Sequence, residues 1–299
     1  MSKPKVIVIL GPTASGKTAL SIELAKLIDG EVISADSRQV YRGLDIGSGK
    51  VTKEEMQGIP HHLIDIADIE NRYSGADFIR GAKAAITDIV SRGKVPIIAG
   101  GTFFYTDLLR GKLQTASVEP DLVLQAELEK LSTTELFSKL ETADPVRAAE
   151  IEPENRRRLV RALEIVATLG HVPPPQAIES DYEWLVFGIK IDSEALAARI
   201  EKRLHDRLQS GMQEEVTALL ASGVDPQRLI DFGLEYRYLT LRQNEELTYE
   251  EMVPQLFAKL RQFAKRQRTW LKRDTEIIWK DFPVTGNDIL PEVQSFIKN

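Results

Sequence analysis

The chain has 299 residues, of which 42% are hydrophobic and 28% are charged, a balance typical of a folded protein with an apolar core. It has no cysteine, which excludes disulfides and thiolate metal sites, and its four histidines lack the spacing of a zinc site. The formal net charge of −6 argues weakly against a nucleic-acid partner, although net charge averages over all faces of a protein. No apolar stretch is long enough to cross a membrane and no targeting segment precedes the first predicted strand, so we expect a cytoplasmic protein without a membrane partner.

The first predicted strand, residues 6–10, leads directly into the sequence GPTASGKT at Gly11–Thr18. A helical pattern follows, which completes the order of strand, loop and helix that a phosphate-binding loop requires. Gly11 and Gly16 allow backbone N–H groups to approach an anion, and Lys17 adds a full positive charge at the helix N-terminus. The motif predicts a site for a di- or triphosphate. It does not distinguish transfer of the phosphates, hydrolysis, and expulsion of diphosphate as a leaving group.

Three further apolar runs predict core strands, at residues 31–34, 94–99 and 184–189. Helical patterns lie between the strands, which predicts an α/β fold with a doubly wound parallel sheet of the P-loop NTPase type. Ligands of such sheets lie beyond the carboxyl ends of the strands, so we expect Asp36, Ser37 and Thr102 to surround the phosphate loop. The last part of the chain predicts three more helical segments, around residues 193–221, 234–245 and 249–273.

Strand signals stop between residues 120 and 169, and helical periodicity replaces them. We therefore expect an inserted helical subdomain at residues 119–182, with the catalytic core formed by residues 1–118 and 183–299. The prolines at 173–175 cannot continue a helix and mark the return of the chain to the core.

Charge is unevenly distributed along the chain. The window 119–154 holds ten acidic residues and three basic ones, and a basic cluster at 156–161 follows it. Seven basic residues and no acid lie between 259 and 273, and four of them repeat on one helix face, Arg261, Lys265, Arg268 and Lys272. Such a stripe is either a solvated helix face or a surface for a polyanion. Two basic clusters in a net-acidic protein favour the polyanion.

Asp36 is the carboxylate at a predicted strand end close to the phosphate loop, which makes it the candidate general base. Its alternative role is a turn former or helix cap before Ser37. A phosphoryl-transfer enzyme would hold Mg²⁺ through Thr18 and a strand-end aspartate, but the strand of residues 94–99 ends in Gly-Gly-Thr without an acid.

Further motifs follow in order: residues 36–41 (DSRQVY) with 45–47 (DIG), 59–65 (IPHHLID), 73–78 (YSGADF), 100–105 (GGTFFY), 158–164 (RLVRALE) and 263–270 (FAKRQRTW). Together with the phosphate loop they resemble the bacterial-type tRNA dimethylallyltransferases, also called tRNA isopentenyltransferases, over about residues 6–273. The chain departs from this family at three places. Residues 47–50 (GSGK) stand where the family more often has G-T-A-K, residues 103–104 (FF) replace the commoner G-L, and residues 233–237 (GLEYR) differ from the usual I-G-Y-[KR]-E.

The resemblance implies transfer of a dimethylallyl group from dimethylallyl diphosphate to N6 of the adenosine immediately 3′ of the anticodon, in tRNAs that read codons beginning with U. It implies that diphosphate is the leaving group, that Thr18 holds Mg²⁺, and that Asp36, Thr13 and Lys17 are catalytic. The implied diphosphate-binding residues are Gly11, Pro12, Thr13, Ala14, Ser15, Gly16, Lys17, Thr18 and Arg203. The implied tRNA contacts are Asp36, Ser37, Arg38, Gln39, Thr102, Arg157, Arg158 and Arg161.

Two other functions stay open from the residues themselves. An ATP-dependent small-molecule kinase would share the phosphate loop and the strand-end aspartate but would leave the basic clusters unexplained. A non-catalytic RNA-binding protein with a decayed nucleotide site would not need Asp36. We expect His61, His62, Phe263 and Trp270 to serve packing rather than chemistry. On the favoured hypothesis the protein is a monomer whose partners are the tRNA anticodon stem-loop and dimethylallyl diphosphate.

Overall fold

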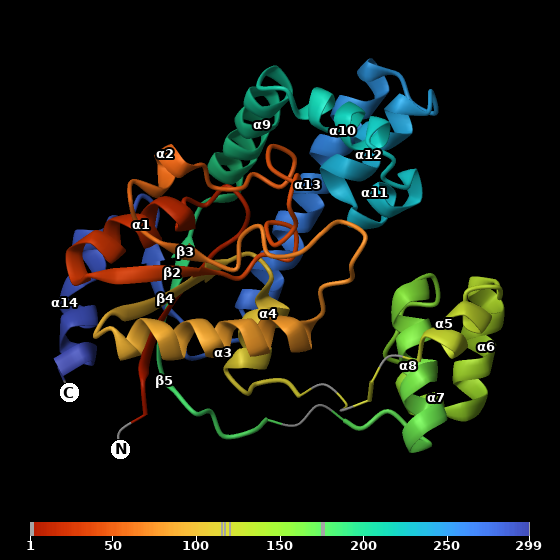
Figure 1. Ribbon diagram of the computed structural model, residues 1–299, viewed down its shortest axis with the longest axis horizontal. Coiled ribbons are helices and arrows are strands. Elements are labelled where there is room, and N and C mark those ends of the chain that lie inside the picture. The colour runs from red at the N-terminus through yellow and green to blue at the C-terminus, as the bar shows by residue number, and fades with distance from the viewer. Residues whose placement is uncertain (1–2, 115, 117, 120, 175–176, 299) are drawn as a thin grey trace. The chain divides into compact units, whose positions relative to one another are not determined.

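The computed structural model describes residues 3–114, 116, 118–119, 121–174 and 177–298. It divides the chain into two compact units, one formed by Met1–Arg110 with Ser180–Asn299 and one by Gly111–Glu179 (Figure 1). The first unit is an α/β structure and the second is helical. The two segments that lead into and out of the helical unit are joined by a hydrogen bond from the Ile178 N–H to the Gly111 carbonyl, at 2.8 Å.

The α/β unit is built on a parallel sheet whose described strands lie in the order β3-β2-β4-β1-β5-β6. The strands are β1 (Lys5–Leu10), β2 (Gly30–Ser34), β3 (His61–His62), β4 (Val95–Gly100), β5 (Glu183–Lys190) and β6 (Ile278–Asp281). The predicted doubly wound α/β fold is confirmed, and the predicted core strands correspond to β1, β2, β4 and β5. The strands β3 and β6 were not predicted, because β3 has only two residues and β6 is a short, mostly exposed edge strand.

Helices cover both faces of the sheet, which explains why the central strand β1 reads as an unbroken apolar run. On one face, Val6 and Val8 of β1 pack against α3 (Gly75–Ser91) and α4 (Phe103–Leu109). On the other face, Ile7 and Ile9 pack against α1 (Lys17–Ile28) and α14 (Gly286–Lys298). A further short helix, α2 (Lys53–Met56), lies between β2 and β3.

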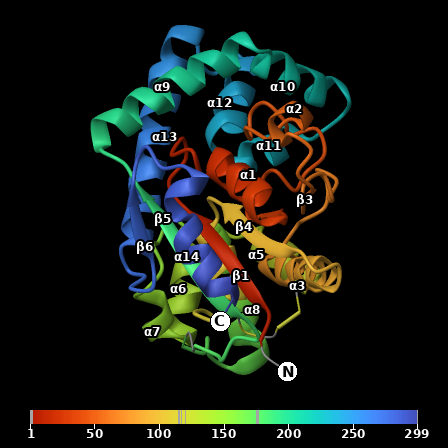
Figure 2. The same ribbon diagram turned by 90° about the vertical axis from the view of Figure 1, so that its left-hand side faces the viewer.

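A separate layer of helices lies beyond the end of the sheet toward which β1 runs (Figure 2). Its members are α9 (Ser193–Gln209), α10 (Met212–Ala221), α11 (Pro226–Phe232), α12 (Leu234–Gln243) and α13 (Tyr249–Leu271). The predicted single helix over 193–221 is wrong, because Gly211 adopts a left-handed φ of 97° and begins a new helix. The segment from Val40 to Leu44, which follows β2, packs into this layer.

The helical unit consists of α5 (Leu122–Leu128), α6 (Thr133–Ala143), α7 (Pro145–Ala148) and α8 (Arg156–Leu169). Leu136, Leu140 and Leu159 are fully buried in its own apolar core. α8 ends at Gly170, whose left-handed φ of 79° closes the helix before the prolines. Pro175, the last of the three prolines predicted to break the helix, lies outside the described residues.

Candidate active site

The phosphate loop connects β1 to α1 and turns sharply at Gly16, which has a φ of 93°. Gly16 is the N-cap residue of α1, and no side chain caps the first turn, so the N–H groups of that turn remain available to an anion. The Ser15 hydroxyl is buried and has no hydrogen-bond partner among the described residues. A buried polar group without a partner is costly, and a phosphate oxygen would satisfy it. The local geometry therefore suits a phosphate group.

Two cations lie close to this loop. The Lys17 ammonium donates only a long hydrogen bond, 3.4 Å, to the Pro12 carbonyl. Burial lowers the pKa of Lys17 to about 8, and the charge of Arg203 acts in the same direction. Arg203, on α9, forms no hydrogen bond or ion pair within the described part of the chain. Burial, then the neighbouring Arg207, lowers the pKa of Arg203 to about 10. An anion bound near both side chains would stabilise their charged forms.

A pocket opens between the phosphate loop and the helical layer. Its lining residues are Thr13, Ala14, Ile200, Arg203, Leu204, Arg207, Glu235 and Leu260. Ile200 and Leu204 of α9 and Leu260 of α13 give it an apolar wall, whereas the arginines of α9 give it positive charge. The pocket is therefore suited to a molecule with a hydrocarbon group at one end and an anion at the other.

Asp36 lies just beyond the carboxyl end of β2. Its Oδ1 accepts hydrogen bonds from the backbone N–H groups of Arg38, at 3.0 Å, and Gln39, at 3.5 Å. The carboxylate therefore has the turn-forming role that was the alternative to a general base. No described residue donates to Oδ2. One oxygen therefore fixes the turn and the other is available to a ligand. The nearby charge of Asp36 also raises the pKa values of Lys17 and Arg203, against the larger effect of burial.

The ends of β2 and β4 approach each other very closely beside Asp36. A Cβ on Gly100 would lie 2.1 Å from the Ala35 carbonyl oxygen, so only glycine fits there. As a result, Thr102 reaches the turn after Asp36, and its hydroxyl accepts a hydrogen bond from the Ser37 N–H at 3.0 Å. The structure thus brings Asp36, Ser37 and Thr102 together.

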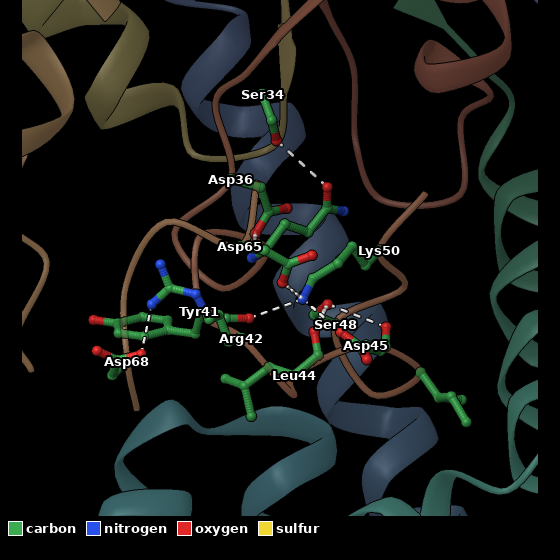
Figure 3. Close-up of polar contacts among 12 residues, drawn as sticks. Ser34, Asp36, Tyr41, Arg42, Leu44, Asp45, Ser48, Lys50, Asp65 and Asp68 are labelled. Atoms are coloured by element: carbon green, nitrogen blue, oxygen red, sulfur yellow. Dashed lines mark hydrogen bonds and ion pairs between the residues drawn. The ribbon is translucent and has the colours of Figure 1, made fainter. Parts of the chain in front are cut away.

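The segment that carries Asp36 is held by a network of polar contacts (Figure 3). Lys50 donates to the Tyr41 carbonyl, at 2.8 Å, and forms ion pairs with Asp45 and Asp65. Gln39 uses its amide internally, since Nε2 donates to the Gly49 carbonyl at 3.1 Å. These contacts give the loop a fixed shape beside the pocket.

Arg38 does not point freely into the pocket. It forms an ion pair of 3.0 Å with Glu235, a buried residue of α12. Thr18 is exposed in the first turn of α1. Within the described residues no cluster of three or more His, Cys, Asp and Glu side chains could hold a metal ion.

The predicted basic contacts at 157–161 lie on α8, in the helical unit. Arg161 is partly occupied, because it donates to the Val118 carbonyl at 2.6 Å and pairs with Glu164 at 3.5 Å. Arg157 and Arg158 are exposed. These two are the residues of the cluster best placed to meet a partner.

His61 and His62 form β3 at the edge of the sheet. His62 bonds to the buried Glu31 at 2.8 Å, and burial lowers the pKa of His61. Trp270 donates its indole N–H to Asp107 at 2.7 Å and packs on the core at the sheet face that α3 and α4 cover. These contacts fix side chains within the fold.

Gln267 was not predicted as a site residue, although it lies in the motif at residues 263–270. Its Oε1 accepts from the Thr13 N–H at 2.8 Å, and its Nε2 donates to the Gly101 carbonyl at 2.9 Å. It is 5% exposed. From α13 it therefore ties the phosphate loop to the segment after β4. Only the fold brings residues so distant in sequence together, so the spacing of the chain gave no signal.

We expect Gln267→Leu to weaken diphosphate binding about tenfold and to lower the free energy of unfolding by about 1–3 kcal/mol, because the partly buried Thr13 N–H and Gly101 carbonyl lose their partner. Titration calorimetry with inorganic diphosphate and thermal unfolding would measure these effects. Gln262→Leu, at an exposed position of the same helix, is the matched control. Equal diphosphate affinities for the two variants would contradict this role of Gln267.

No helix in the described part of the chain is long and apolar enough to cross a membrane.

The phosphate loop at the junction of β1 and α1, in a parallel sheet with helices on both faces, defines a P-loop α/β protein. Residues 39–274 match the sequence model of the family described as IPP transferase. The chain belongs to this family.

Relatives and solved structures agree with that assignment. The chain is 42% identical to a tRNA dimethylallyltransferase of an Exiguobacterium species, covering 100% of this chain and 98% of the relative. It is 42% identical to the tRNA dimethylallyltransferase of Staphylococcus aureus, covering 94% and 93%. The crystal structure of a tRNA isopentenylpyrophosphate transferase from Staphylococcus epidermidis superposes with a TM-score of 0.72 at 38% identity, covering 99% of both chains. A eukaryotic dimethylallyltransferase acting on tRNA superposes with a TM-score of 0.76 at 30% identity, covering 93% of this chain and 74% of that one.

Proposed function

We propose that this protein transfers the dimethylallyl group of dimethylallyl diphosphate to N6 of the adenosine immediately 3′ of the anticodon, in tRNAs that read codons beginning with U. The products are N6-isopentenyladenosine in tRNA and diphosphate. The observation that carries the proposal is the pocket, in which the phosphate loop and the unpaired Arg203 adjoin an apolar wall and Asp36 lies near these cations. The names of the relatives support the same reaction.

The diphosphate would bind at the first turn of α1, where backbone N–H groups, the Ser15 hydroxyl and Lys17 face it. Arg203 would contact it from α9. The dimethylallyl group would lie along Ile200, Leu204 and Leu260, because a hydrocarbon group gains free energy by leaving water for an apolar wall. The backbone of Thr13, held by Gln267, keeps the loop in place beside the donor.

In the reaction, the bond between the allylic carbon and the diphosphate oxygen breaks while the bond between that carbon and adenine N6 forms. Lys17 and Arg203 stabilise the negative charge that develops on the departing diphosphate. Asp36 Oδ2 accepts the proton that N6 must lose, while Oδ1 remains in its turn. The positive charge that develops on the allylic carbon is neutralised by the electron pair of N6, and Asp36 takes the proton that N6 releases.

Thr18 is the residue that would hold Mg²⁺. The donor chemistry fits, because Mg²⁺ usually keeps several waters and takes most other ligands from substrate phosphates, so it needs few protein oxygens. When bound, the ion would offset part of the charge of the diphosphate.

Adenine N6 is not reachable while the base is stacked in the anticodon loop, so the nucleotide must be turned out toward Asp36. Ser37 and Gln39 belong to the turn that Asp36 forms, and Thr102 bonds to Ser37, so these three residues are our proposed contacts for the base. Arg157 and Arg158 are our proposed phosphate contacts, and neutralising phosphates makes binding salt-dependent. We expect the enzyme to act as a monomer in the cytoplasm.

Mass spectrometry of tRNA nucleosides, from cells lacking the gene and from cells in which it is restored, tests the proposal. We expect isopentenyladenosine to be absent without the gene and to return with it. Restoration by a copy encoding Asp36→Ala would show that a carboxylate is not needed. A failure of the intact gene to restore the nucleoside would overturn the proposed function.

A further inference from the structure

Arg207 lies one helical turn beyond Arg203 on α9 and lines the same pocket, yet it belongs to none of the motifs that indicated the diphosphate site. Its side chain is 12% exposed. The guanidinium donates to Glu235 Oε1 at 3.2 Å and, at a long 3.4 Å, to the Gly47 carbonyl. A largely buried cation with such limited hydrogen bonding retains donors for a ligand.

Arg207 can occupy this position only because residue 49 is glycine. A Cβ on Gly49 would lie 1.5 Å from Nη2 and 2.5 Å from Cζ of Arg207. Gly49 also has a φ of 62°, in the left-handed region. The absence of a side chain at residue 49 therefore leaves the space that the Arg207 guanidinium fills.

Glu235 is the anion that positions Arg207. It is 4% exposed, and its carboxylate is shared between Arg207 and Arg38, which lies 3.0 Å away. Gly49 and Glu235 therefore both adjoin the guanidinium of the same arginine.

The charges around the pocket do not balance without a ligand. Besides burial, Arg203 and Arg207 lower the pKa of Lys17, and Arg207 lowers that of Arg203, so the three cations lie within electrostatic range, with Asp36 acting in the opposite direction on both. Glu235 faces Arg207 but is shared with Arg38, and Arg203 has no ion-pair partner among the described residues. A diphosphate carries several negative charges and can accept hydrogen bonds from more than one guanidinium.

We propose that Arg207 binds the diphosphate of the donor beside Arg203, and that Glu235 and Gly49 are positioning residues for its guanidinium. The identity of the donor rests on the function proposed above. The binding of diphosphate itself does not, since it can be measured without RNA and without transfer.

Titration calorimetry of the full chain with inorganic diphosphate tests this role. We expect Arg207→Met to raise the Kd for diphosphate about tenfold or more, because a charge-assisted hydrogen bond is lost. The matched control is Lys202→Met, which removes the same charge from the same helix at an exposed residue paired with Asp206. Its Kd should stay within about twofold of the wild-type value, since surface ion pairs contribute little.

A double variant, Arg207→Met with Glu235→Gln, separates contact from net charge and avoids leaving Glu235 without its partner. If Arg207 contacts diphosphate, the double variant also binds about tenfold more weakly than the wild type. Wild-type affinity in the double variant would overturn the proposal, because Arg207 would then only neutralise Glu235. Weaker binding of the anticodon stem-loop with unchanged diphosphate binding would overturn it as well and assign Arg207 to RNA.

Gly49→Ala supplies an independent test of positioning. In the wild-type background the added methyl group should displace Arg207 and weaken diphosphate binding, whereas in the Arg207→Met background it should cause no further loss. Additive losses in the two backgrounds would contradict the role of Gly49. If the wild type bound diphosphate but transferred no dimethylallyl group to tRNA, the proposed function would fail while the assignment of Arg207 stood.

Discussion

Replacing Asp36 by asparagine is expected to lower kcat for transfer by about 10²- to 10⁴-fold while diphosphate and the anticodon stem-loop still bind. Asparagine retains the oxygen that accepts from the Arg38 and Gln39 N–H groups, so the turn after β2 can persist. It cannot accept a proton from adenine N6. Single-turnover kinetics with pre-bound RNA would measure the chemical step, and fluorescence anisotropy would measure RNA binding.

Asp68→Asn is the matched control for this experiment, because Asp68 is an exposed acid on the neighbouring segment after β3, where it pairs with Arg42 (Figure 3). Its kcat should equal that of the wild type. If Asp36→Asn retained a wild-type kcat, the carboxylate would have only its turn-forming role. If the variant lost RNA binding but kept the rate of the chemical step, Asp36 would be a recognition residue and not a base.

Replacing Lys17 by methionine is expected to lower kcat/KM by about 10²- to 10³-fold, since a buried cation beside the leaving diphosphate is lost.

Diphosphate binding should also depend on pH through Lys17. Burial lowers the pKa of Lys17 to about 8, so the free enzyme loses this proton as the pH rises through that value. Diphosphate favours the charged form, and binding near pH 8.5 should therefore be accompanied by proton uptake.

Calorimetry of diphosphate binding in buffers of different ionisation enthalpy would measure that uptake. Lys17→Arg is the control, because arginine keeps the charge and does not titrate in this range. Equal proton uptake by the wild type and by Lys17→Arg would contradict the assignment. Lys17 affects stability in the opposite direction from diphosphate binding, which weakens as the pH rises. Between about pH 8 and 10.5 the unfolded chain retains a proton that folded Lys17 has lost. Lys17 therefore makes the free energy of unfolding rise with pH in this range.

Much of the fold followed from local patterns. The phosphate loop could be predicted because its chemistry requires consecutive residues, and β1, β2, β4 and β5 because buried strands read as apolar runs. The break between α9 and α10 was missed, since the amphipathic pattern continues through it and only the left-handed φ of Gly211 ends the first helix.

The residues that connect parts of the site could not be predicted in the same way. Gln267 meets Thr13 across 254 positions of sequence, and Glu235 meets Arg38 across 197, so only folding reveals these contacts. Arg199 and Arg207 did leave a signal, because they lie four residues to either side of Arg203 and such spacing places all three on one face of a helix. Arg199 uses that placement to donate to the Ala14 carbonyl at 2.7 Å.

On the proposed function, the phosphate loop binds a diphosphate that departs from a hydrocarbon group. The most direct measurement combines the purified protein with an anticodon stem-loop RNA and dimethylallyl diphosphate labelled in its allylic carbon. We predict that label enters N6 of the adenosine next to the anticodon and that diphosphate is released in equal amount, without consumption of ATP. Unlabelled RNA, together with ATP-dependent phosphorylation of a small molecule, would contradict the account.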